Sequence, residues 1–99
     1  MARGPNTTTP GKPFDPATIE AVWRKGTPEP GWPDRRRDAC RASMQRTLYG
    51  KIVARGWEID RIVPVSRGGT DRLDNLQPLQ WENNRHKADS TNWSCKITH

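Results

Sequence analysis

The sequence has few of the residues that build a large hydrophobic core. Leu, Ile, Val and Phe together number fourteen of 99 residues, and such a low share combined with high net charge is typical of weakly folded chains. Most of the aliphatic and Trp residues nevertheless lie between Ile19 and Trp81, and both ends of the chain are polar. The distribution therefore predicts one small domain with a modest core, whose size makes its stability marginal.

Cysteine is also scarce, and no apolar run is long enough to cross a bilayer or to form the core of a signal peptide. Cys40 and Cys95 stand far apart and belong to no C-x-x-C pair. We therefore expect a soluble, cytoplasmic protein with no membrane partner, in which both cysteines are small buried hydrophobic residues. A disulfide stays open as the alternative, although a reducing cytosol disfavours it.

Acidic residues are also fewer than basic ones. Eleven Asp and Glu face seventeen Lys and Arg, most of them Arg, which gives a formal net charge of +6. Arg suits bidentate contact with phosphate, so the excess predicts an anionic partner, most simply DNA. A solvated basic surface without a partner is the plainer alternative.

The N-terminal part predicts a tail, a helix and a loop. Residues 1–13 are Thr, Pro, Gly and basic residues without apolar periodicity, which is typical of a flexible tail. Asp15 is a favourable N-cap, Pro16 suits the first helical position, and Gly26 supplies a C-terminal stop. The apolar residues between them, Ile19, Val22 and Trp23, follow helical spacing. Three prolines and two glycines in 26–33 predict a wrapping loop without regular structure.

The middle and C-terminal parts alternate short elements. Residues 35–52 fit either a helical stripe or an irregular hairpin. The β-forming residues 57–62 predict a strand, Pro64 and the Gly68-Gly69 pair predict a loop, and 76–79 can return as a second strand before a helix over 80–88. Apolar and polar residues alternate again over 93–97, which predicts a final strand.

One motif stands out in this part of the chain. The stretch from Trp57 to Lys87 reads W-E-I-D-R-I-V-P-V-S-R-G-G-T-D-R-L-D-N-L-Q-P-L-Q-W-E-N-N-R-H-K. It resembles the HNH endonuclease signature, in which an acid and a His end a strand, a Gly-Gly loop and a D-N-L element follow, and an Asn or His closes the motif on a short helix. A looser resemblance to small stand-alone bacterial HNH proteins extends back through F-D-P-A-T-I to Phe14.

The resemblance implies a ββα-metal site with one divalent ion, Mg²⁺ or Mn²⁺. Asp60 matches the acidic metal ligand of the family, and Asn84, nine positions after Asn75, matches the closing ligand. Magnesium is typically held by one or two carboxylates with phosphate oxygens and water, so a site with two protein ligands is sufficient. Asn75 matches the residue that ties together the loop between the strands. Alone, Asp60 would be read as a surface ion-pair partner and Asn75 as a turn residue.

Arg61 departs from the family pattern, because the residue after the acid is there the His that acts as general base. A guanidinium, with a pKa above roughly 12, cannot accept a proton from water. Losing a general base costs about 10²- to 10⁴-fold in rate, so we expect reduced activity, with Arg61 left to bind the scissile phosphate. His86 is the alternative base to consider, but it lies about 200° around the helix from Asn84 and should point away from the metal.

Other positions of the motif match nucleic-acid contacts or exclude zinc. Many HNH proteins hold a structural zinc with C-x-x-C pairs, and two of those positions are here Gln80 and Asn83, so no zinc is expected. Trp57 and Trp81 are expected to pack in the core rather than to stack on bases. Four cations should form a basic rim for DNA beside the flexible glycines: Arg67, Arg72, Arg85 and Lys87.

Together these observations predict an α+β fold, a small single domain with a ββα-metal (HNH) finger, an N-terminal helix and a flexible tail over 1–13. The domain should span 14–99, with the finger at about 57–89. The expected function is a nucleic-acid-binding HNH-type endonuclease that hydrolyses phosphodiester bonds with activity reduced by Arg61. Two alternatives stay open: a catalytically inactive DNA-binding pseudonuclease, and a scaffold for a protein partner.

Overall fold

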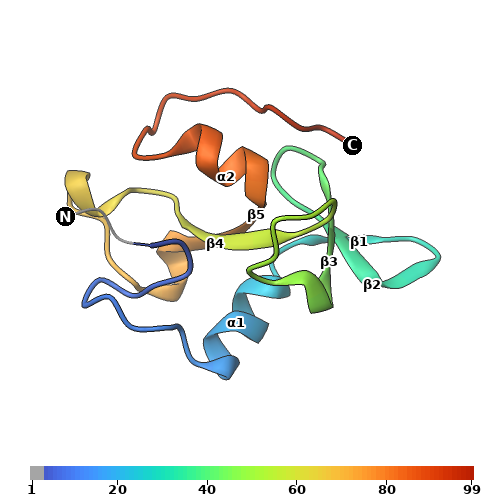
Figure 1. The fold of residues 1–99 in the computed structure, drawn as a ribbon, viewed down its shortest axis with the longest axis horizontal. Helices are drawn as coiled ribbons and strands as arrows, with labels where there is room; N and C mark the ends of the chain where they lie inside the picture. The colour runs from blue at the N-terminus through green and yellow to red at the C-terminus, as the bar shows by residue number, and fades with distance from the viewer. Residues whose placement is uncertain (1–3) are drawn as a thin grey trace.

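The computed structural model describes residues 4–99, which form a small α+β unit with two helices and two antiparallel sheets (Figure 1). Helix α1 (Pro16–Trp23) begins as the sequence predicts, because the Asp15 carboxylate accepts a hydrogen bond from the Thr18 N–H at 2.7 Å. The helix buries Val22 and Trp23. Among the described residues, no helix has the length and apolarity needed to span a bilayer.

The segment after α1 is a hairpin, so the prediction of an irregular loop over 26–33 is wrong. Strands β1 (Thr27–Glu29) and β2 (Trp32–Arg37) pair antiparallel around Gly31, whose φ of +83° suits a tight turn. β3 (Ser43–Gln45) pairs with the Arg35–Arg37 end of β2. The prolines are tolerated because Pro28 lies on an edge strand at an irregularity in the register, and Pro33 lies outside the part of β2 that pairs with β3. Of the two alternatives for 35–52, the irregular hairpin is therefore the one observed.

The second sheet is a two-stranded ribbon followed directly by a helix. β4 (Trp57–Arg61) and β5 (Leu76–Gln80) pair in a register that runs from Trp57 opposite Gln80 to Arg61 opposite Leu76. Helix α2 (Trp81–Lys87) follows and packs on both strands, while α1 contacts β5 from the other side (Figure 1). The predicted order of strand, loop, strand and helix is thus observed. Three single 3₁₀ turns complete the elements: η1 (Arg46–Leu48), η2 (Val65–Arg67) and η3 (Leu73–Asn75).

The core lies between α1, β3 and the β4–β5 ribbon. Trp57 is 1% exposed, and its ring lies 5.1 Å from that of Trp23 and 4.9 Å from that of Tyr49, measured between centroids. The expectation that Trp57 packs in the core is confirmed. The other buried members of this cluster are Phe14, Val22, Met44, Ile59 and Leu76.

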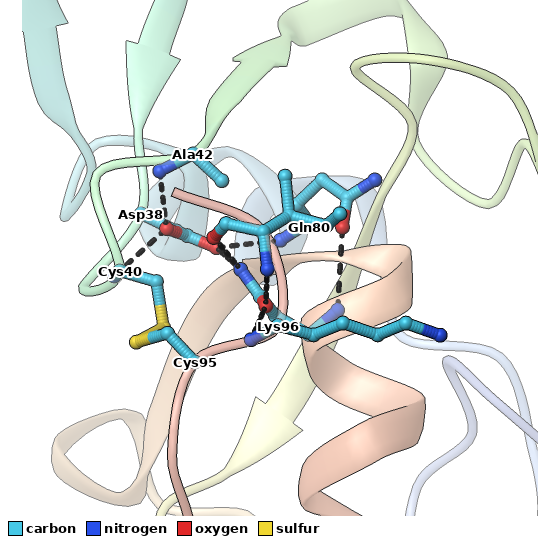
Figure 2. The surroundings of a disulfide bond; sticks show 8 residues. Asp38, Cys40, Ala42, Gln80, Cys95 and Lys96 are labelled. Carbon is cyan, nitrogen blue, oxygen red and sulfur yellow. Dashed lines mark hydrogen bonds between the residues drawn. A yellow bond between two sulfur atoms is a disulfide. The ribbon is translucent and has the colours of Figure 1, made fainter. Parts of the chain in front are cut away.

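The two cysteines form a disulfide, which corrects the expectation that both are free buried residues. Cys40 is buried and Cys95 is exposed. Figure 2 shows the bond joining the turn after β2 to the C-terminal segment. The cysteines are separated by 55 positions in the sequence, so nothing in the sequence indicates that they pair. Only folding brings them together.

The strand expected over 93–97 is also absent. The Asn83 side chain instead satisfies this segment, because its carbonyl oxygen accepts from the Lys96 and Ile97 N–H groups and its amide donates to the Ile97 carbonyl. Asp38 lies next to Asn83 and accepts a hydrogen bond from the Asn83 amide (Figure 2). Its carboxylate accepts from the backbone N–H groups of Cys40, Ala42 and Gln80.

Residues 4–13 were expected to belong to a flexible tail, yet they make specific contacts with the rest of the chain. The Asn6 side chain accepts from the Ile59 N–H on the free edge of β4 at 2.8 Å. The Thr7 carbonyl accepts from Arg61, and the Thr9 N–H donates to Asp71, both at 2.7 Å. This segment therefore covers an edge that would otherwise be unpaired. Residues 1–3 of the expected tail lie outside the described residues, and the domain boundary at residue 14 stays a prediction.

Candidate functional site

A hollow of about 630 Å³ opens between β4, α2 and the loop that follows β4. Glu58 and Asp60 line it from β4, and Asn84 and Arg85 line it from α2. Alternate residues of a strand share a face, which explains why the two carboxylates point the same way. We call this cavity the β4–α2 hollow. It contains the two expected metal ligands, Asp60 and Asn84, together with Arg61.

Asp60 is 5% exposed, and both of its oxygens have partners. Oδ1 lies 3.0 Å from the Lys87 ammonium, and Oδ2 accepts from the Gln77 amide at 2.8 Å. Burial raises the pKa of the Asp60 carboxyl above its ordinary value, although the Gln77 hydrogen bond and the Lys87 and Arg61 charges oppose this effect. The carboxylate thus depends on Lys87 as its counter-charge.

Glu58 is a member of the site that the sequence interpretation missed. It is 1% exposed, and its carboxylate accepts from the Asn84 amide at 2.8 Å and from Arg85 at 2.9 Å. The hydrogen bond and the charge of Glu58 raise the pKa of Arg85. The E-I-D spacing was the signal that could have found it, because residues two apart on a strand face the same side.

The oxygen donors around the hollow fit a hard divalent cation by their chemistry. Asp60, Glu58 and the Asn84 amide supply carboxylate and carbonyl oxygens, the kinds of ligand that Mg²⁺ and Mn²⁺ take. Within residues 4–99, no cluster of three or more His, Cys, Asp or Glu side chains is arranged for a metal. The Lys87 ammonium already places a positive charge against Asp60, so a bound ion would share that carboxylate with Lys87.

Arg61 is held at the edge of the hollow by groups outside the expected motif. Its Nε donates to the Asp71 carboxylate at 2.8 Å, and its Nη2 lies 2.7 Å from the same oxygen and 2.7 Å from the Thr7 carbonyl. Partial burial raises the pKa of Asp71, but the Thr9 N–H and Arg61 outweigh it, so the pKa of this carboxyl is lowered. Arg61 is therefore a fixed positive charge, and its Nη1 makes no hydrogen bond with any part of the chain that the structure describes.

Asn75 ties the loop between β4 and β5. Its side-chain oxygen accepts from the Val63 N–H at 2.9 Å, and its amide donates to the carbonyls of Val63 and Thr70 at 3.0 and 2.8 Å. Gly69 is needed in the same loop, because a Cβ there would lie 1.6 Å from the Val63 carbonyl oxygen. Close approach at this glycine therefore serves the loop itself rather than a phosphate.

The four expected DNA-contacting cations do not form one rim. Lys87 is 2% exposed and donates to Asp60 and to the Arg61 carbonyl, so its assignment to an exposed rim is wrong. Arg85 is paired with Glu58, and the exposed Arg72 with Asp74. Arg67 is exposed and has no ion pair with any of residues 4–99.

His86 and Trp81 lie away from the hollow. His86 is exposed and lines a separate depression with Ser90, Asn92 and Trp93, as expected from its position on the helix. The Trp81 indole N–H donates to the Val53 carbonyl at 3.0 Å, and the ring is only partly buried. Neither residue is placed to take part in chemistry at Asp60.

Comparison with protein-family models, with curated proteins and with solved structures finds no match for this chain. These comparisons therefore assign the chain to no family.

Proposed function

We propose that this chain is a nucleic-acid-binding protein of the HNH type, whose β4–α2 hollow hydrolyses phosphodiester bonds with a divalent metal at a reduced rate. The observation that carries the proposal is the meeting of Asp60, Asn84 and Arg61 at one open hollow. The order of strand, loop, strand and helix, with Asn75 tying the loop, is what the resemblance implies for a ββα-metal finger.

In this proposal, some residues of the hollow bind the metal and others bind the phosphate. Asp60 and Asn84 would hold Mg²⁺ or Mn²⁺, which supplies charge neutralisation at the phosphate and at the departing oxygen when bound. The free Nη1 of Arg61 provides a donor for a phosphate oxygen, and Asp71 and Thr7 keep that guanidinium in place. Arg67 adds an unpaired charge on the adjoining loop.

The rate should be low because no His side chain lines the hollow among the described residues, although the carboxylates of Glu58 and Asp89 line it beside Asp60. Arg61 stays protonated, Asp60 is paired with Lys87, and His86 faces another depression. A nicking assay on supercoiled plasmid with Mg²⁺ or Mn²⁺ tests the proposal. Arg61→His should raise cleavage by roughly 10²-fold, the typical contribution of a general base.

Two controls make this assay specific to the hollow. Lys51→His places an imidazole at an exposed residue that does not line the hollow, and should leave cleavage unchanged. Adding Asp60→Ala to Arg61→His should remove the gain. Equal cleavage by the wild type and Arg61→His would place the base elsewhere and would contradict the assignment.

A second candidate is a binding module without catalysis. The specific observation in its favour is that both oxygens of Asp60 are engaged by protein donors, Lys87 and Gln77. In that case neither the wild type nor Arg61→His cleaves, yet both bind duplex DNA with an affinity that falls as salt rises. Loss of duplex binding on charge reversal at Arg67 would support DNA binding at the surface around the β4–α2 hollow.

A further inference from the structure

The β1–β2 hairpin carries an exposed aromatic residue that the fold does not use. Trp32 is 53% exposed, the largest side chain among the exposed hydrophobic residues of 4–99. The hairpin extends from one end of the molecule, and the loop after β4 lies at the other end (Figure 1). A single exposed hydrophobic residue is common on protein surfaces, so the groups that lie beside Trp32 decide what this ring can bind.

Arg35 lies over one face of this ring. Its guanidinium carbon is 3.8 Å from the Trp32 ring centroid, within the range of a cation–π contact. The neighbouring Arg36 and Arg37 are different, because Arg36 donates to the Gly26 carbonyl and Arg37 donates to Glu29 and the Arg41 carbonyl. The Arg35 guanidinium has no hydrogen bond or ion pair with the described part of the chain. It is therefore a positioned charge that is free to meet an anion.

The charge around the hairpin favours an anionic partner. Residues 24–41 include six Lys and Arg but three Asp and Glu. Of those acids, Asp38 is buried, Glu29 is neutralised by Arg37, and Asp34 alone is exposed without an ion pair to any described residue. A hollow of about 270 Å³ lies beside Trp32 and is also lined by Pro28, Gly31 and Arg35. An aromatic face with adjoining positive charge is the combination that binds unpaired nucleotides, because every base can stack and every linkage carries a phosphate.

We propose that the tip of the β1–β2 hairpin binds single-stranded nucleic acid, with one base stacked on the free face of Trp32 and a phosphate beside Arg35. The choice of nucleic acid as partner rests on the proposed function, but the surface is separate from the β4–α2 hollow. The longest extent of the molecule is 40 Å, which equals about twelve base-pair steps of DNA. A strand of moderate length therefore reaches both surfaces.

The test compares a labelled six-nucleotide oligothymidylate with a blunt duplex of twenty base pairs, by fluorescence anisotropy at low salt. Trp32→Ala should weaken oligothymidylate binding by about 5- to 150-fold, the range for loss of one base–aromatic stack. Trp32→Phe keeps a ring and should stay within about threefold of the wild type. Arg35→Met should weaken binding less than Trp32→Ala, and Lys51→Met is the matched control at an exposed cation elsewhere.

The two probes separate this inference from the proposed function. Oligothymidylate binding that is unchanged in Trp32→Ala overturns the inference. Duplex binding without oligothymidylate binding also overturns it while leaving the function at the hollow intact. Oligothymidylate binding that depends on Trp32, without duplex binding or cleavage, supports the hairpin and contradicts the function proposed for the hollow. Binding of neither probe contradicts both.

Discussion

The β4–α2 hollow and the β1–β2 hairpin use charge in opposite ways. In the hollow, Asp60 is paired with the buried Lys87, and Glu58 is paired with Arg85, whose side chain is 43% exposed; both carboxylates are nearly inaccessible. At the hairpin, Trp32 is exposed, and the partly buried Arg35 lies over its ring without an ion pair to any described residue. The charged residues of the motif are thus paired with other residues of the same chain. The residues left available for an outside partner, Trp32 and Arg35, lie in a segment that matches no motif.

The largest expected difference between the two regions is in stability, and it is tested by removing one charge from each region. Lys87→Met leaves the buried Asp60 without its counter-charge and should lower the free energy of unfolding by about 3–5 kcal/mol. Arg35→Met, which removes a charge that has no ion pair with any described residue, should change it by less than about 0.5 kcal/mol. Urea unfolding of the two variants gives both values. Equal effects would show that the hollow and the hairpin do not differ as described.

The loss in Lys87→Met should also depend on pH. Burial raises the pKa of Asp60, and removing Lys87 raises it further. A carboxyl with a raised folded pKa stabilises the fold most when protonated, and this contribution is lost as pH rises through that pKa. The variant should therefore be closer to wild type in stability at pH 5 than at pH 8.

The disulfide ties the end of the hairpin sheet to the segment that passes over α2, so removing it tests whether the two regions are stabilised together. Replacing both Cys40 and Cys95 with Ser opens a loop of 55 residues and should cost about 2–4 kcal/mol. The hydrogen bonds between Asn83 and residues 96 and 97 remain as the second attachment. Thermal unfolding of the oxidised, reduced and double-Ser proteins measures this contribution. A reduced wild type as stable as the oxidised one would contradict it.

The smallest expected effect concerns Asp71, which holds Arg61. The pKa of Asp71 is lowered in the folded protein, so its contribution to stability is present above the unfolded pKa and is lost as pH falls through the folded pKa. Between roughly pH 5 and pH 2, the wild type should lose more stability than Asp71→Asn. Asp74→Asn, at an exposed acid of the same loop, is the control and should follow the wild type. Parallel curves for all three proteins would show that Asp71 does not stabilise this edge of the hollow.

The order of elements was readable because its signals are local. Asp15 and Pro16 start a helix through backbone hydrogen bonding and fixed φ, and the β-forming residues that begin at Trp57 predict the strand observed there. The same reading failed at 26–33, where prolines on an edge and beside a bulge do not prevent pairing. It also failed at 93–97, because alternation alone cannot supply the neighbouring strand that a ladder needs.

The candidate site shows the same division between sequence and fold. The sequence by itself determined which chemical groups are present near Asp60, and that position 61 holds a side chain unable to act as a base. Only the tertiary structure decided that Lys87 is buried against Asp60, that Asp71 and Thr7 hold Arg61, that Glu58 joins the hollow, and that Cys40 meets Cys95. The physical reason is that side-chain identity is fixed residue by residue, whereas burial and pairing depend on contacts between segments far apart in the chain.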